Sequence, residues 1–215
     1  MKRRFFTQRL AAISLSIVTG LASLGVASIA PAQASVENEA AATAHIDRMI
    51  DEMKGVLLTD EGDMATREAA VTHLLDTYFD FPGISRFSAG QYWRTASKEE
   101  QAEYTMVIRN VIIGTVVRNF DQLKGLSYAP QAVKAKGKKL VIVSGKFSDD
   151  TGARPSVLVN WRVVTRPEQP PRVLDIEIEN ISMLVTQKQE NIAIVRKNKG
   201  EFAALIAAMR EKLAE

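Results

Sequence analysis

The sequence contains no cysteine and only two histidines among its 215 residues. The absence of cysteine excludes disulfide bonds and metal binding through thiolates, so a packed core must stabilise the fold. Neither His45 nor His73 has a serine and a carboxylate placed by the sequence to complete a nucleophilic set, although Asp76 follows His73 by about one turn. We interpret both as solvent-edge or helix-capping residues. Glycine-rich phosphate loops are also missing. We therefore expect a protein that is not an enzyme and uses no cofactor or metal.

Residues 1–34 have the pattern of a secretory signal peptide. Basic side chains of this leader are confined to its first nine residues, and an uncharged apolar run continues to Ala30. Ala32 and Ala34 then supply the small residues that a signal peptidase reads. The alternative is an uncleaved membrane anchor, because the run is long enough to span a bilayer. Its glycines and serines favour cleavage, which leaves residues 35–215 as a single exported domain.

The net charge changes sign when the leader is removed. The whole sequence has 28 basic and 25 acidic side chains, and the leader holds four of the basic ones and no acid. The remaining domain, with 24 basic side chains, lacks the basic excess that nucleic-acid binding requires, so we expect no nucleic-acid partner. One local basic cluster surrounds Gly137, and we interpret it as a solvated hairpin turn or a docking patch for an acidic partner or anionic headgroup. It comprises Lys134, Lys136, Lys138 and Lys139.

The periodicity of apolar residues changes once along the domain. An alanine-rich, acidic lead-in at residues 35–44 is expected to be loosely held, and helical spacing follows in three segments. These segments are residues 46–57, 71–79 and 97–123. The period then becomes two, with short connections that include a proline-rich loop at 166–171, and this predicts an antiparallel meander. The expected strands are residues 128–135, 140–148, 156–165 and 173–181, and two further helices are expected at 186–197 and 201–213.

These elements predict an α+β fold. We expect an antiparallel sheet of four strands, or slightly more, that is twisted and covered on one face by helices. Asp175, Glu177 and Glu179 alternate with apolar residues in the last strand. A comb of metal ligands is one interpretation of this alternation, but a solvated sheet face explains it more simply, because a cation needs ligands that converge.

Residues 79–100 join two of the expected helices and contain unusually many aromatic residues. The connection turns at Pro82 and Gly83, and Ser97 with Glu100 has the spacing of a capping box that opens the next helix. Loops of this kind are where functional residues concentrate. The aromatic residues of the connection are Phe79, Phe81, Phe87, Tyr92 and Trp93.

Two blocks of sequence resemble the signature of the MlaC family, also called toluene-tolerance or Ttg2D-like proteins. The first block contains Phe79-Asp80-Phe81, Gly90-Gln91-Tyr92-Trp93-Arg94 and Ser97 with the acids after it; the second is residues 175–186. The order and spacing match over nearly the whole domain. Two departures are Asn180, where the family commonly has glycine, and the polar segment 187–191, which replaces a segment usually carrying aromatics.

The resemblance implies a fold and a function. Related proteins have a fold similar to nuclear transport factor 2 and enclose an apolar, lipid-holding cavity between sheet and helices. They are periplasmic phospholipid carriers that maintain the lipid asymmetry of the outer membrane. The implied partners are a phospholipid ligand, an inner-membrane ABC complex with an MCE-domain subunit, and an outer-membrane lipoprotein associated with a porin.

We assign the expected lipid-binding residues by locating this cavity between the apolar positions of the long helix and those of the sheet. Acyl chains are expected to lie along one stripe of the long helix and to face apolar residues of the sheet, with aromatic residues of the connection framing the cavity. The helix residues are Tyr104, Ile108, Ile112, Val116 and Phe120. The sheet residues are Val157, Val159, Trp161, Ile176 and Ile178. The framing residues are Phe79, Phe81, Tyr92 and Trp93.

Arg94 stands beside the aromatic cluster, and the lipid headgroup is expected at the mouth of the cavity because burying an unpaired phosphate is costly. Arg94 could equally be a structural ion-pair former. Three alternative functions remain at this point. The protein could carry a hopanoid or another polycyclic lipid, it could be an isomerase with a buried carboxylate, or it could be an adaptor with a filled core and no lipid.

Overall fold

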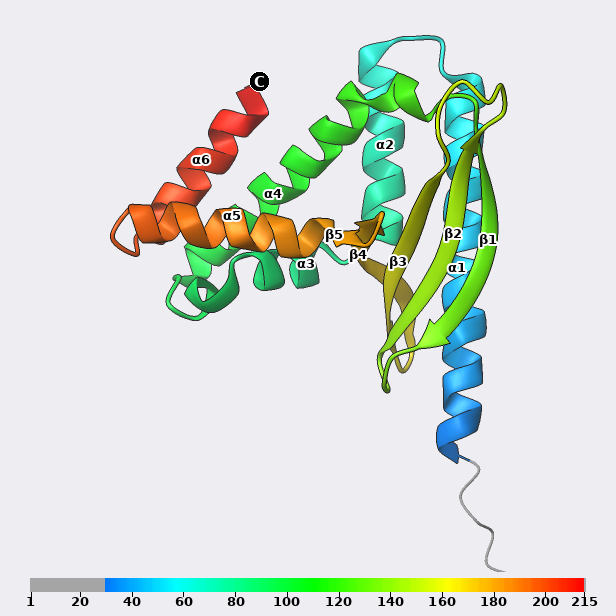
Figure 1. Cartoon of the computed structure of the whole chain (residues 1–215). Coiled ribbons are helices and arrows are strands. Elements are labelled where there is room, and N and C mark those ends of the chain that lie inside the picture. The colour runs from blue at the N-terminus through cyan, green and yellow to red at the C-terminus, as the bar shows by residue number, and fades with distance from the viewer. Residues whose placement is uncertain (1–29, 215) are drawn as a thin grey trace, which may run out of the picture.

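The computed structural model in Figure 1 describes the backbone of residues 30–214 and the side chains from residue 35 onward. Most of the predicted leader therefore lies outside the described residues. The helices are α1 (Ala30–Thr59), α2 (Met64–Tyr78), α3 (Phe81–Ser88), α4 (Lys98–Arg118), α5 (Met183–Lys197) and α6 (Phe202–Ala214). Two short 3₁₀ helices are η1 (Gly90–Arg94) and η2 (Phe120–Leu123). The strands are β1 (Leu126–Ala135), β2 (Leu140–Asp149), β3 (Val157–Arg166), β4 (Gln169–Ile178) and β5 (Ile181–Ser182).

The strands form one antiparallel sheet in chain order, β1-β2-β3-β4-β5. The prediction of an α+β fold with an antiparallel meander is confirmed, and β5 adds a short fifth strand. The proline-rich loop is shorter than expected, because β3 extends to Arg166 and β4 begins at Gln169. The turn therefore consists of Pro167 and Glu168, and Glu168 adopts a left-handed φ of 59°. The prolines of β4 lie at the start of the strand, where a missing N–H is tolerated.

The long helix α1 packs across β1 to β4 on the apolar face of the sheet (Figure 1). Paired residues such as Val143 with Trp161, and Val163 with Val173, place buried side chains on this face. The prediction that residues 35–44 are loosely held is wrong, because α1 begins before them and Ala42 is fully buried. Alanine is the best helix former and its small side chain lets the helix approach the sheet closely.

The prediction of a solvated acidic face is wrong for Asp175, which is 4% exposed. Its carboxylate accepts hydrogen bonds from the hydroxyl of Ser182 (2.6 Å) and the backbone N–H of Leu184 (2.9 Å), and it lies 3.4 Å from Arg162. The N-terminus of α5 covers this carboxylate, and a negative charge is favourable there. Asn180, in the turn before β5, adopts a left-handed φ of 65°, a conformation that glycine and asparagine tolerate best.

The long helix α4 begins at the predicted capping box: Ser97 Oγ accepts from Glu100 N–H (3.1 Å), and Glu100 accepts from Ser97 N–H (2.8 Å). The helix packs mainly against α2, α3 and α6, so helices rather than the sheet cover most of its apolar surface. In Figure 1, α4 runs diagonally between α6 and α2, while α1 lies behind the strands. The molecule thus has a sheet half, built on α1, and a helical half, and α3 and α5 lie where the two meet.

The two histidines have structural positions. His45 is buried, and its Nε2–H donates to the carbonyl of Tyr78 at the end of α2 (3.1 Å). Burial lowers the pKa of His45. His73 is largely exposed and lies 3.7 Å from Glu52. These positions agree with the helix-capping and solvent-edge interpretations.

Within residues 30–214, no helix has both the length and the hydropathy needed to cross a membrane.

The turn between α1 and α2 is held by Asp60, which accepts hydrogen bonds from Arg67 (2.8 Å) and Lys124 (2.9 Å). The hydrogen bonds from Arg67, followed by those from Lys124, hold the pKa of the Asp60 carboxyl well below its usual range. A carboxyl whose pKa is lower in the folded state contributes stability above its unfolded pKa of about 4 and loses it as the pH falls below that value.

We therefore expect Asp60→Asn to destabilise the protein at pH 7 and to make the remaining stability less sensitive to acid. Urea unfolding of both proteins between pH 7 and pH 2 measures this difference. The gap between the two stabilities should narrow as the pH falls below about 4, because the Asp60 carboxyl then becomes protonated in the unfolded chain while the folded protein still holds it ionised. A gap that stays constant over this range would contradict the assignment.

Candidate functional site

The aromatic connection at residues 79–100 is mostly helical and not an extended loop. Asp80 caps α3, because its Oδ1 accepts from the Gly83 N–H (3.1 Å), and Pro82 lies in the first turn of the helix. The expected turn at Pro82 and Gly83 is therefore wrong. Aspartate at the N-cap and proline in the first turn are both typical of helix starts, so the sequence carried the signal. A positive φ of 61° at Gly90 then separates α3 from η1.

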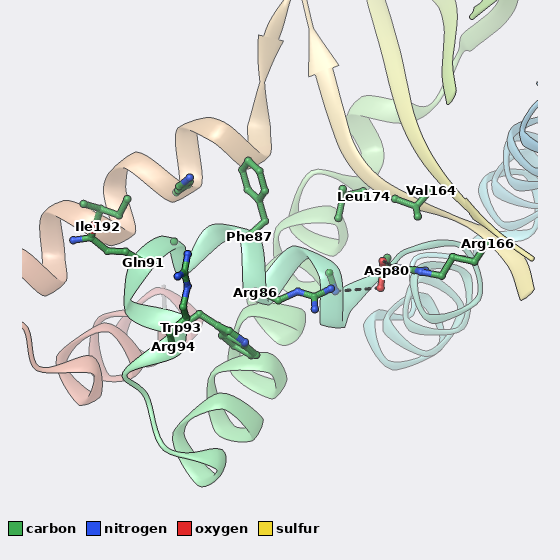
Figure 2. Close-up of a pocket in the computed structure, with 13 residues that line it drawn as sticks. Asp80, Arg86, Phe87, Gln91, Trp93, Arg94, Val164, Arg166, Leu174 and Ile192 are labelled. Carbon is green, nitrogen blue, oxygen red and sulfur yellow. Dashed lines mark hydrogen bonds and ion pairs between the residues drawn. The ribbon is translucent and has the colours of Figure 1, made fainter. Parts of the chain in front are cut away.

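A cleft of about 710 Å³ opens where α3, η1 and α5 meet the end of β3 and the middle of β4. Figure 2 shows side chains from these separate elements arranged around it. Its volume lies in the range of small-molecule sites. The lining residues are Asp80, Gly83, Arg86, Phe87, Gly90, Gln91, Trp93, Arg94, Val164, Arg166, Leu174, Lys188 and Ile192.

One part of the cleft lining is apolar, and we call it the apolar floor. It consists of Phe87, Trp93, Val164, Leu174 and Ile192. Phe87 is 38% exposed, and the other four are half-buried. Apolar side chains that remain accessible in a cleft offer contact area to an apolar ligand.

The other part of the lining is cationic, and we call it the basic rim: Arg86, Arg94, Arg166 and Lys188. Among the described residues that line the cleft, Asp80 is the one carboxylate, and its Oδ2 accepts from Arg166 at 2.6 Å. Its other oxygen caps α3, so both carboxylate oxygens are occupied by structural contacts. A carboxylate held in this way is a poor candidate for the proton transfers that an isomerase requires.

Two glycines keep the cleft in shape. A Cβ at Gly83 would lie 2.5 Å from Asp80 Oδ2, so any side chain there would displace the capping carboxylate. A Cβ at Gly90 would lie 3.0 Å from Ile192 Cδ1 and 3.3 Å from Lys188 Cε. Gly90 thus allows α5 to approach η1 closely and places both Lys188 and Ile192 at the cleft.

A buried hydrogen-bond network joins α3, α4 and α5 beneath the cleft. Asn191, which is fully buried, donates to the hydroxyl of Tyr104 (2.7 Å) and to the carbonyl of Ser88 (3.1 Å). The hydroxyls of Ser88 and Tyr104 are 2.8 Å apart, and Gln187 donates to Asn191 Oδ1 (2.8 Å). Burial raises the pKa of Tyr104 to about 12, so the phenol stays protonated. This network fixes α5, which carries two of the cleft residues.

The structure distributes the predicted lipid-binding residues over three environments. Trp93 is the one member of the set that lines the cleft described above. Several members are buried in the packed core: Phe81, Tyr104, Ile108, Phe120, Val159 and Trp161. Of the others, Ile178 is 39% exposed and the rest are half-buried: Phe79, Tyr92, Ile112, Val116, Val157 and Ile176.

Part of the cleft was predicted from the sequence, namely Trp93 as lipid-binding, Arg94 at the headgroup position and Phe87 as an aromatic of the connection. Arg86 and Lys188 were missed, because they follow no local pattern that separates them from ordinary surface residues, and the sequence could not show that Leu174 of the last strand joins them. Lys188 belongs to the polar segment that departs from the resembled family, and its ammonium lies 4.8 Å from the centre of the Phe87 ring. Within the described part of the chain, no cluster of three or more His, Cys, Asp or Glu could hold a metal ion.

Comparisons with known proteins give a family and a fold. A family model described as MlaC protein matches residues 43–211, which is most of the chain. A solved structure of a phospholipid-binding protein from Ralstonia solanacearum, in complex with a phospholipid, superposes with a TM-score of 0.67 at 22% identity. The match covers 80% of this chain and 96% of that protein. No curated protein sequence matches significantly.

Proposed function

The chain belongs to the MlaC family, and on this premise we propose that it binds phospholipid and carries it through the periplasm between an outer-membrane and an inner-membrane complex. The observation that supports this proposal best is the combination of an apolar floor and a basic rim in one cleft. A phospholipid needs both, because its acyl chains require apolar contact and its phosphate requires cationic or hydrogen-bonding partners. A bound phospholipid in the solved relative of the same fold adds support.

The energetics explain why such a carrier needs no catalytic residue. Each CH₂ group buried from water is worth about 0.8 kcal/mol, so exposing two acyl chains of about 30 carbons in total would cost on the order of 20 kcal/mol. A protein that covers the chains as well as a bilayer does can exchange lipid with a membrane complex at little net cost. The direction of transport is then set by the partners, for which we propose an ABC complex with an MCE-domain subunit and a lipoprotein–porin complex.

We propose that the phosphate lies at the basic rim, next to Arg94, and that the acyl chains lie on apolar residues that are not fully buried. A two-chain lipid is larger than the ligands that fill clefts of this size. The chains would therefore continue from the apolar floor onto accessible members of the predicted set on α4, such as Ile112 and Val116. The fully buried members of the set would pack beneath this surface. Cleavage of the leader after Ala34 would release the carrier into the periplasm.

The proposed function predicts that lipid copurifies with the protein. Purification from the periplasm without detergent, followed by native mass spectrometry and organic extraction, should yield a stoichiometric two-chain phospholipid. A polycyclic lipid such as a hopanoid would instead indicate a carrier of that class. A folded protein that contains no lipid and cannot be loaded from vesicles would contradict the carrier function and favour an adaptor.

A further inference from the structure

Three cations of the cleft have no partner among the described carboxylates. Arg166 is paired with Asp80, but none of the described carboxylates forms an ion pair with Arg86, Arg94 or Lys188. Arg86 and Arg94 are exposed, and the half-buried Lys188 lies over the ring of Phe87. Positive charge that the protein itself leaves unpaired in a cleft attracts anions.

The number of unpaired positive charges in the cleft affects which lipid headgroup can bind favourably. A phosphodiester carries one negative charge, which is fewer than the three unpaired cations around it. A zwitterionic headgroup would add its own ammonium to this site, and like charges brought together are unfavourable. A headgroup without a cation avoids this repulsion, and the exposed amide of Gln91 could bond to a hydroxyl of a polyol headgroup.

We propose that the basic rim selects phospholipids with a net anionic headgroup over zwitterionic ones. This inference rests on the proposed function and names the lipid class that the same cleft prefers. The rim residues that discriminate are Arg86, Arg94 and Lys188, whereas Arg166 is committed to Asp80. Charge pairs that are exposed to water contribute little each, so the preference is an enrichment of about three- to tenfold and not an exclusion. It weakens as salt is added.

The test uses vesicles that contain phosphatidylethanolamine and phosphatidylglycerol in equal amounts. Delipidated protein is incubated with these vesicles and re-isolated, and the ratio of the two bound lipids is measured by mass spectrometry. Because both lipids come from the same surface, attraction of the protein to a charged membrane affects both equally. We expect phosphatidylglycerol to be enriched about three- to tenfold in the wild-type protein.

Matched variants assign the preference to the rim. The combined substitutions Arg86→Gln, Arg94→Gln and Lys188→Gln should bring the bound ratio close to that of the vesicles. The control replaces three exposed lysines that do not line the cleft and should keep the enrichment. The control substitutions are Lys134→Gln, Lys136→Gln and Lys139→Gln. The double variant Arg86→Gln with Arg94→Gln changes only exposed side chains. It replaces the triple variant if substitution of the half-buried Lys188 impairs folding.

Each outcome has a distinct meaning. Bound lipid in the vesicle ratio would overturn the selectivity and leave the carrier intact. Enrichment that persists in the rim variants, or that is lost equally in the control, would overturn its assignment to the rim. A wild-type protein that takes up neither lipid would contradict the proposed function itself.

Discussion

The substitution Leu174→Asp is expected to reduce lipid retention more than about tenfold, which corresponds to about 1.4 kcal/mol or more of lost binding free energy. Leu174 lies half-buried on the apolar floor, in the middle of β4 and next to the start of α3. A carboxylate at this position would have to lose its hydration against an acyl chain, at a cost of several kcal/mol. It would also add a second negative charge beside Asp80 and so repel the phosphate.

Lipid phosphorus per mole of protein after detergent-free purification measures this effect. Leu174→Met keeps the volume and apolarity of the side chain and serves as the control. Circular dichroism and thermal unfolding establish that the aspartate variant is folded. If that folded variant retains as much lipid as the control, the lipid does not lie on the apolar floor.

The same measurement on Ile112→Asp locates the acyl chains. Ile112 lies half-buried on α4, outside the cleft, and we expect its substitution to reduce retention as well. Loss of lipid from the Leu174 variant alone would confine the chains to the cleft. Loss from the Ile112 variant alone would place them against α4 and away from the apolar floor.

The substitution Asn191→Ala is expected to have the largest effect on stability, a loss of about 2–4 kcal/mol. Each buried polar group left without a partner costs about 1–3 kcal/mol, and this change removes hydrogen bonds to the Tyr104 hydroxyl and the Ser88 carbonyl. For a domain of this size the melting temperature should fall by about 5–12 °C. Because α5 also carries the cleft residue Lys188, lipid retention should fall together with the stability of this variant.

A double-mutant cycle with Tyr104→Phe separates the network from simple loss of volume. The two residues share a hydrogen bond of 2.7 Å, so the double variant should lose less stability than the sum of the single variants. Gln187→Ala, at the half-buried end of the network, should cost less than Asn191→Ala. Additive losses for the first pair would show that the network does not act as a unit.

The amino-acid sequence by itself determined the class of fold and some of the residues at which helices begin. Apolar spacing changes from helical to alternating near residue 126, and this change predicts helices followed by a meander because only those periods bury one face of each element. The capping box at Ser97 and Glu100 is local chemistry and appeared in the structure as predicted. The Asp80 cap was equally local, and its signal was present but interpreted as a turn.

Only the tertiary structure decided which surfaces meet. The alternation of Asp175 with apolar residues predicts two faces for the strand, but a register shift at Leu174 places that side chain at the cleft with Val164, and no local rule states that α5 covers Asp175. Tyr104 lies on an apolar stripe, and the sequence cannot show that Asn191, from a distant helix, engages its hydroxyl. The cleft brings Arg86 of α3 together with Leu174 of β4 and Lys188 of α5. Periodicity specifies the buried face of an element, whereas the partner of that face depends on packing between segments that are far apart in the chain.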